Sequence, residues 1–123
     1  MRTIAVAIGG LLGSLARFWL AGVVQRVNGS EFPFGTLAVN VLGSFVIGLV
    51  MALALERGVV GPTARLFLTV GFCGGFTTMS TFGYETFALL RDGQTAFAFG
   101  NMAASLGGSL VAVWLGYTLG RTA

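Results

Sequence analysis

The stretch that decides the fold is GGFTTMSTFGYE, residues 74 to 85. It begins with two adjacent glycines and places several hydroxyl-bearing side chains inside a segment that is otherwise apolar. Backbone groups in hydrocarbon must be satisfied, so an interrupted helix is tolerated in a membrane only where protein or a cavity surrounds the interruption. If the segment spans a membrane, the stretch predicts a helix that is broken near the middle.

The composition of the whole chain indicates that lipid is its solvent. Only 9% of the 123 residues are charged, 20 are glycine and none is histidine, and the mean hydropathy is +0.89. A soluble domain carries roughly 25% charged residues. The cationic side chains are all arginines, most of them in loops or near helix ends and without interleaved aromatic residues, so no nucleic-acid partner is expected.

Four segments are long and apolar enough to cross a membrane, which takes about 20 residues. They run from about 3 to 24, 35 to 55, 65 to 90 and 95 to 119, with loops of charged or turn-forming residues between them. No soluble domain remains, so residues 1–123 are expected to form a single four-helix transmembrane unit. This is an all-α membrane protein.

The distribution of arginines gives only a weak orientation signal. An even number of spans places both termini on one side, and that side carries four of the arginines near helix ends against two on the other. The four are Arg2, Arg57, Arg65 and Arg121, and the two are Arg26 and Arg91. Because the positive-inside rule needs a clear excess, insertion in both orientations is plausible.

The break in the third span would expose polar backbone groups of both signs. A half-helix ending at Gly74 directs free carbonyls at the midplane, which suits a cation. A second half-helix from about Thr78 directs amide hydrogens there, which suits an anion. This pattern favours an ion site; the alternative is a glycine kink relieved by the hydroxyls of Thr77 and Thr78.

Uncharged hydrogen-bonding side chains form two stripes, on the second and fourth spans. A spacing of four residues puts each stripe on one helix face. The stripes consist of Thr36, Asn40 and Ser44, and of Asn101, Ser105 and Ser109. Neutral donors with few fixed charges suit a small, strongly hydrated anion. An enzyme is not expected, because the chain has no histidine, no clustered carboxylates and no nucleophile beside a base.

Rows of small residues predict close helix packing. Glycine pairs four residues apart occur at 9 and 13, 71 and 75, and 116 and 120, and such pairs let helix backbones approach in lipid. Four short helices enclose little interior, so more than one copy is expected. Cys73 is the single cysteine; it is either a small apolar filler or a contact with a second copy.

Arg17 and Glu85 are charged residues within the first and third spans. One interpretation gives them a role in the ion pathway. The other is structural, with a long side chain that reaches the interface or caps a helix.

Three motifs in order resemble the CrcB, or Fluc, fluoride channel family. GFCGGFTTMSTFGYE (71–85) is similar to the family's third-helix hallmark, FPFGTLAVNVLGSFVIG (32–48) to its second-helix motif and LGSLARFW (12–19) to its first-helix motif. Together with the length and the four spans, the resemblance covers essentially the whole chain.

The resemblance implies a fluoride-selective channel that exports fluoride passively across the cell inner membrane and lowers cytoplasmic fluoride. Members of the family are antiparallel, dual-topology homodimers with two fluoride pores and a central structural Na⁺. Residue by residue, the resemblance assigns the sodium ligands to the carbonyls of Gly74 and Thr77. It assigns the fluoride pathway to Asn40, Met79, Ser80, Thr81, Phe82, Ser105 and Ser109, with Arg17 and Glu85 at further family positions.

The chain departs from the family pattern at three positions. Met79 stands where phenylalanine is usual, Gly83 where serine is usual, and Asn101 where some relatives carry an aromatic residue. The departure at Met79 bears directly on the expected contact between an anion and two phenylalanines.

Two other classes compete with this interpretation. Small dual-topology multidrug antiporters have a similar length and four spans, but they need a glutamate in the first helix, where this chain has Arg17 and no acid. A non-transporting scaffold would have no reason to break one helix and align hydroxyls beside it.

Overall fold

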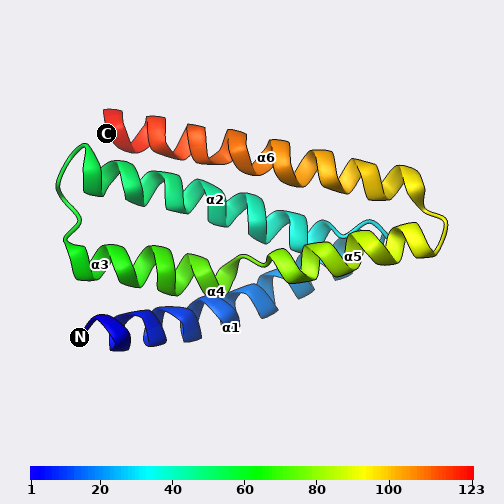
Figure 1. The fold of residues 1–123 in the computed structure, drawn as a ribbon, viewed down its shortest axis with the longest axis horizontal. Helices are drawn as coiled ribbons and strands as arrows, with labels where there is room; N and C mark the ends of the chain where they lie inside the picture. Colours follow the sequence, from blue (N-terminus) through cyan, green and yellow to red (C-terminus); the bar gives the residue numbers. More distant parts are fainter.

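The computed structural model describes all 123 residues and is entirely helical. The helices, in chain order, are α1 (Arg2–Asn28), α2 (Phe34–Leu55), α3 (Pro62–Leu66), the π-helical segment η1 (Phe67–Cys73), α4 (Gly74–Phe76), α5 (Met79–Arg91) and α6 (Thr95–Thr122). In Figure 1 the long helices lie roughly side by side, and both chain termini are at the same end.

Four helical segments are long and apolar enough to cross a membrane, as the sequence predicts. They are Arg2–Asn28, Phe34–Leu55, Pro62–Arg91 and Thr95–Thr122, with mean hydropathies between 1.2 and 2.3. The third is the least apolar of the four, because it includes the hydroxyl-rich stretch. The predictions of an all-α fold and four spans are confirmed.

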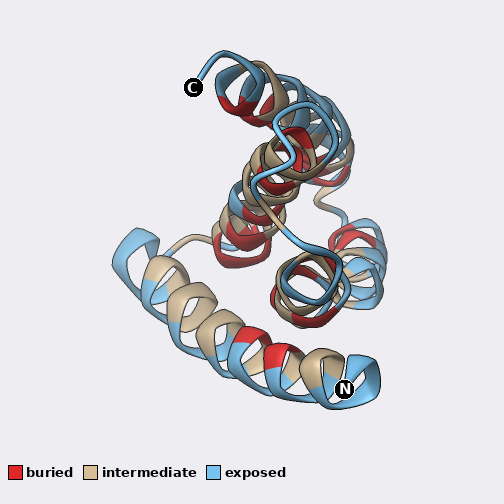
Figure 2. Cartoon of the chain, turned by 90° about the vertical axis from the view of Figure 1, so that its left-hand side faces the viewer, coloured by how far each residue is buried: buried red, intermediate tan, exposed pale blue.

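The helices form two closely packed groups. α2 packs mainly against α6, whereas α1 packs mainly against η1, also contacts α2 and α4, and has no close backbone approach to α5 or α6. Figure 2 shows α1 along one side of the molecule, with its buried residues confined to a short stretch. Those residues are Gly9 and Gly13. The broken third span therefore lies with its first half against α1.

The predicted glycine packing is confirmed in both groups. A methyl group at Gly13 would collide with the carbonyl oxygen of Phe72, and one at Gly75 would come within 2.6 Å of the carbonyl oxygen of Gly10. Between α2 and α6, a methyl group at Gly116 would collide with the carbonyl oxygen of Phe45. Such contacts allow backbone-to-backbone packing that no larger residue permits.

Helical structure in the third span continues further than the sequence indicates. Gly74 does not end it: its φ of −60° and ψ of −38° are helical, and the helix runs to Phe76. Gly75 lies against the backbone of α1, so this glycine allows close packing of the two helices and does not end the helix. Extended backbone begins at Thr77 (φ −93°, ψ 160°) and ends with Thr78 (φ −152°, ψ 115°).

Candidate ion-conducting site

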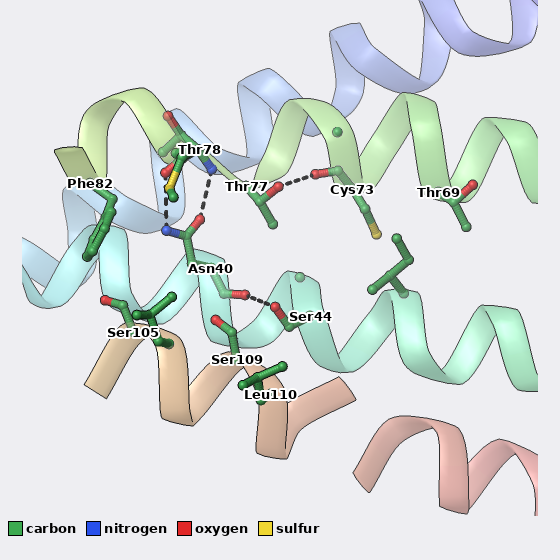
Figure 3. A pocket seen from close by; sticks show the side chains of 15 residues that line it. Asn40, Ser44, Thr69, Cys73, Thr77, Thr78, Phe82, Ser105, Ser109 and Leu110 are labelled. Carbon is green, nitrogen blue, oxygen red and sulfur yellow. Dashed lines mark hydrogen bonds between the residues drawn. The ribbon is translucent and has the colours of Figure 1, made fainter. Parts of the chain in front are cut away.

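A cavity of about 490 Å³ lies beside the extended residues of the third span. Its walls come from α2, the segment from η1 to Thr78, α5 and α6 (Figure 3). Not one of its 15 lining residues is charged. Its polar atoms belong to backbone groups, hydroxyls and one carboxamide, so the cavity offers an ion hydrogen-bonding groups without a fixed counter-charge.

Asn40 of α2 holds the extended segment in place. Its carboxamide Oδ1 accepts from the amide of Thr78 at 2.8 Å, and its Nδ2 donates to the carbonyl of the same residue at 3.2 Å. Figure 3 shows both bonds. This two-bond contact satisfies a backbone donor and acceptor that would otherwise be left free in hydrocarbon.

Thr78 also begins the helix that follows the break. Its Oγ1 accepts from the amide of Thr81 at 3.3 Å, which is the usual contact of a threonine at the N-terminus of a helix. The residues of the break are thus positioned by one side chain from α2 and by their own hydroxyls.

The hydrogen bonds around the break leave particular carbonyl oxygens uncommitted. The Cys73 carbonyl accepts from both the amide and the hydroxyl of Thr77, each at 2.9 Å. The helical partner of the Gly74 carbonyl would be the amide of Thr78, but that amide donates to Asn40. The carbonyl of Thr77 accepts no hydrogen bond. Gly74 and Thr77 therefore carry the oxygen atoms available to a cation.

A second cavity, of about 290 Å³, is lined by charged residues. Arg17 and Glu85 both line it, together with Thr36 and Thr81, and Thr78 lines both cavities. Arg17 donates from Nε to the carbonyl of Gly75 at 2.9 Å, so the helix-capping interpretation of Arg17 has direct support. Oε1 of Glu85 is buried and has no hydrogen-bond partner.

Most residues predicted for the ion pathway meet at the uncharged cavity. Those that line it are Asn40, Gly74, Thr77, Met79, Phe82, Ser105 and Ser109. Met79 lies at the rim, with 72% of its surface exposed. Thr81 lines the charged cavity instead, and Ser80 is exposed and lines neither. The two hydroxyl residues that the sequence assigned to the fluoride pathway at the start of α5, Ser80 and Thr81, therefore do not line the uncharged cavity.

One residue of the site, Thr86, was not singled out from the sequence. It accepts at Oγ1 from the Asn101 Nδ2 at 3.0 Å. Thr86 follows Phe82 by one helical turn, so a continuation of the polar pattern along α5 would have indicated it. Thr78 was expected to begin the second half-helix, but neither its bonds to Asn40 nor the pairing of Asn101 with α5 follows from a local pattern.

The groups around the break are not those of a side-chain metal site. No three His, Cys, Asp or Glu side chains gather anywhere in the structure. The free oxygen atoms near the break are backbone carbonyls, the kind of group that binds cations in the unwound helices of membrane transporters.

Comparisons with known proteins agree with the fold and the motifs. Residues 4–117 match the family model described as CrcB-like protein, Camphor Resistance (CrcB). The fluoride-specific ion channel FluC of Geobacter sulfurreducens is 50% identical over 118 residues, covering 96% of this chain and 95% of that protein. That of Pelobacter propionicus is 50% identical over 119 residues, covering 97% and 91%. That of Geobacter sp. (strain M21) is 47% identical over 116 residues, covering 94% of each chain. The chain belongs to the CrcB family.

Proposed function

We propose that this protein is a fluoride channel that lets fluoride leave the cell passively and so lowers its cytoplasmic concentration. The observation that carries the proposal is the uncharged cavity beside the break, where Asn40, Phe82 and Ser105 meet. The relatives named fluoride-specific ion channel support the same function along nearly the whole chain. The protein is a channel and not an enzyme.

The chemistry of the cavity suits a small anion. Fluoride leaving water must exchange its hydration shell for hydrogen bonds from the protein, and hydroxyl and carboxamide donors supply such bonds. The absence of acidic side chains from the lining avoids repulsion of an anion. The ring edge of Phe82 carries partial positive charge and can contact the anion where water is excluded.

The antiporter alternative requires an acid that this chain does not place in the first span. α1 contains arginines at 2, 17 and 26 and no aspartate or glutamate. Glu85 comes from the third span and lines the charged cavity, not the uncharged one. Proton-for-cation exchange through a first-helix carboxylate is therefore unsupported.

The same proposal includes an antiparallel homodimer with a central sodium ion. One chain offers two uncommitted carbonyls, at Gly74 and Thr77, and Gly74 is exposed on the surface of the monomer. A symmetric second copy would double the number of carbonyls and cover that surface. The sodium ion would neutralise the negative end of the half-helix and fix the break.

The proposal also includes dual orientation in the cell inner membrane, which the arginine distribution supports. The four-to-two count leaves little preference, and an antiparallel dimer needs both orientations in one membrane. A tag attached at Ala123 should be accessible from both faces of right-side-out vesicles. Labelling from one face alone would contradict dual orientation without affecting the fluoride assignment.

Fluoride efflux from proteoliposomes, followed with a fluoride electrode, tests the function. We expect fast fluoride efflux that needs no proton gradient, with chloride retained in parallel vesicles. Efflux that depends on a proton gradient, or chloride release at the same rate, would overturn the channel assignment.

Replacement of sodium tests the ion at the break. With a larger monovalent cation on both sides, fluoride flux should slow or stop while the dimer stays assembled, as judged by its elution volume. Unchanged flux after verified removal of sodium would contradict the sodium site and leave the channel assignment standing.

A further inference from the structure

We propose that Asn101 is a positioning residue that controls the Ser105 hydroxyl by reversing a short chain of hydrogen bonds when an anion arrives. The inference rests on the proposed function and concerns the same cavity. Asn101 is 1% exposed and does not line the cavity, so it acts only through its neighbours.

The hydrogen bonds of this group all point away from the cavity. Ser105 donates its hydroxyl proton to Oδ1 of Asn101 at 3.2 Å, and Asn101 donates from Nδ2 to Oγ1 of Thr86 at 3.0 Å. Thr86 in turn donates to the carbonyl of Phe82 at 2.8 Å. A hydroxyl has a single proton, so Ser105 as arranged has none to offer an anion.

The same three side chains support the opposite direction. A half-turn of the Asn101 carboxamide exchanges its oxygen and its nitrogen, because the two groups occupy equivalent places. Thr86 then donates to Asn101 Oδ1, Asn101 donates to Ser105 Oγ, and the Ser105 proton turns into the cavity. The number of protons is unchanged, and each side chain keeps a partner.

The reversed arrangement favours an anion more than an isolated serine would. A hydroxyl that accepts one hydrogen bond becomes a stronger donor in another, since bonds in a chain polarise one another. The Phe82 carbonyl loses only the bond from Thr86, because a carbonyl inside a helix has an intrahelical partner. Without an anion the first arrangement is restored, and no free hydroxyl proton is left in an empty cavity.

Ser109 provides an internal contrast. It lines the same cavity one turn further along α6, but its side chain makes no hydrogen bond to another residue. Asn101 therefore affects one of the two serines and leaves the other unchanged.

A double-mutant cycle in proteoliposomes tests the inference. Asn101→Leu keeps the size of the side chain and removes its hydrogen bonds, and Ser105→Ala removes the hydroxyl. Ser105→Ala should lower fluoride flux about tenfold, the loss of one hydrogen bond to a charged group. Asn101→Leu should lower it severalfold, because the Ser105 hydroxyl keeps its proton but loses the bond that polarises it. The double variant should be lowered no further than Ser105→Ala alone, because Asn101 acts through Ser105. As the matched control, Asn101→Leu should still cost severalfold in a Ser109→Ala background.

Thr86 keeps the inference testable if Asn101→Leu does not fold. Thr86 does not line the cavity, so its side chain reaches the anion only through Asn101. Thr86→Val should lower flux severalfold, Thr86→Ser should retain it, and the effect of Thr86→Val should vanish in a Ser105→Ala background. Multiplicative losses in either cycle would overturn the inference, whereas a wild-type protein without fluoride flux would overturn the proposed function.

Discussion

The two halves of the third span are held to the molecule by different means. The half before the break, formed by α3, η1 and α4, packs on α1, where glycines bring backbone against backbone and Arg17 adds one hydrogen bond to the Gly75 carbonyl. The half after it, α5, has no close backbone approach to α1 and packs mainly on α6, where the Thr86–Asn101 hydrogen bond joins the two helices. Close backbone packing dominates the first contact, whereas a hydrogen bond between two side chains joins the helices in the second.

The two halves therefore differ in how easily their contacts can rearrange. Backbone packing tolerates no rearrangement without a shift of whole helices, so the first half holds the break and its carbonyls rigidly. Hydroxyl and carboxamide groups reorient by rotation of a few bonds, so the second half can respond to an ion without moving a helix. In our proposal the first half holds the sodium ion, and the polar groups of the second half bind fluoride.

The largest expected effect comes from disturbing the packing between α1 and the first half of the third span. Gly13→Ala would place a methyl group against the Phe72 carbonyl oxygen, which belongs to backbone and cannot turn away. We expect a loss of ~3 kcal/mol in stability, at the upper end for overpacking. Thermal unfolding in detergent measures it. Gly83→Ala is the matched control, because nothing lies within 4 Å of the added methyl group; equal losses in the two variants would refute the steric account.

The next effect concerns Thr77 and Thr78, the extended residues between the two halves of the third span. Asn40→Leu leaves both the amide and the carbonyl of Thr78 without their partner. A buried unsatisfied group costs about 1–3 kcal/mol, so we expect a loss of ~2 kcal/mol in thermal unfolding. Ser44→Ala is the control, because that hydroxyl bonds only the Asn40 carbonyl within α2. If Ser44→Ala were as damaging as Asn40→Leu, Asn40 would not be the residue that fixes the break.

A smaller effect tests the contact between side chains of α5, the second half of the third span, and an anion. Met79 and Phe82 both line the uncharged cavity, but only Phe82 has a ring whose edge can contact an anion. Phe82→Ile should lower fluoride flux about tenfold, a barrier increase of ~1.4 kcal/mol. Met79→Phe restores the residue usual in the family and should leave flux near the wild-type rate or above it.

Flux and dimer stability must be measured together for this pair. Met79 has a flexible, polarizable side chain without a quadrupole, so its contact with fluoride is weaker than that of a ring. Undiminished flux in a stably assembled Phe82→Ile variant would rule out the role of Phe82.

The smallest effect lies at the end of α5, beyond the packed region. Arg91 and Asp92 form an ion pair at 3.1 Å, with side chains that are 51% and 61% exposed. Exposed pairs of this kind contribute little because water screens them. Asp92→Asn should leave both unfolding temperature and fluoride flux unchanged. A measurable loss in either would show that polar contacts other than the Thr86–Asn101 hydrogen bond also hold α5 in place.

The sequence by itself determined the four spans and the packing role of the glycine pairs, and it indicated the stretch in which two extended residues occur. Each of these follows from local properties. Apolar runs of sufficient length fix the spans, and TTMS supplies hydroxyls where the backbone leaves the helix. Glycine pairs at a spacing of four mark a face with no side chains, whatever packs there.

Only the tertiary structure decided which polar groups meet. The helix passes through Gly74 because α1 lies against Gly75, a contact that no local pattern reveals. Thr81 and Phe82 are adjacent in sequence yet line different cavities, because the surrounding helices determine what each face of α5 meets. The partner of Asn101 depends on how α5 and α6 cross. A sequence fixes the face on which a side chain lies, whereas the packing of other helices fixes what that face contacts.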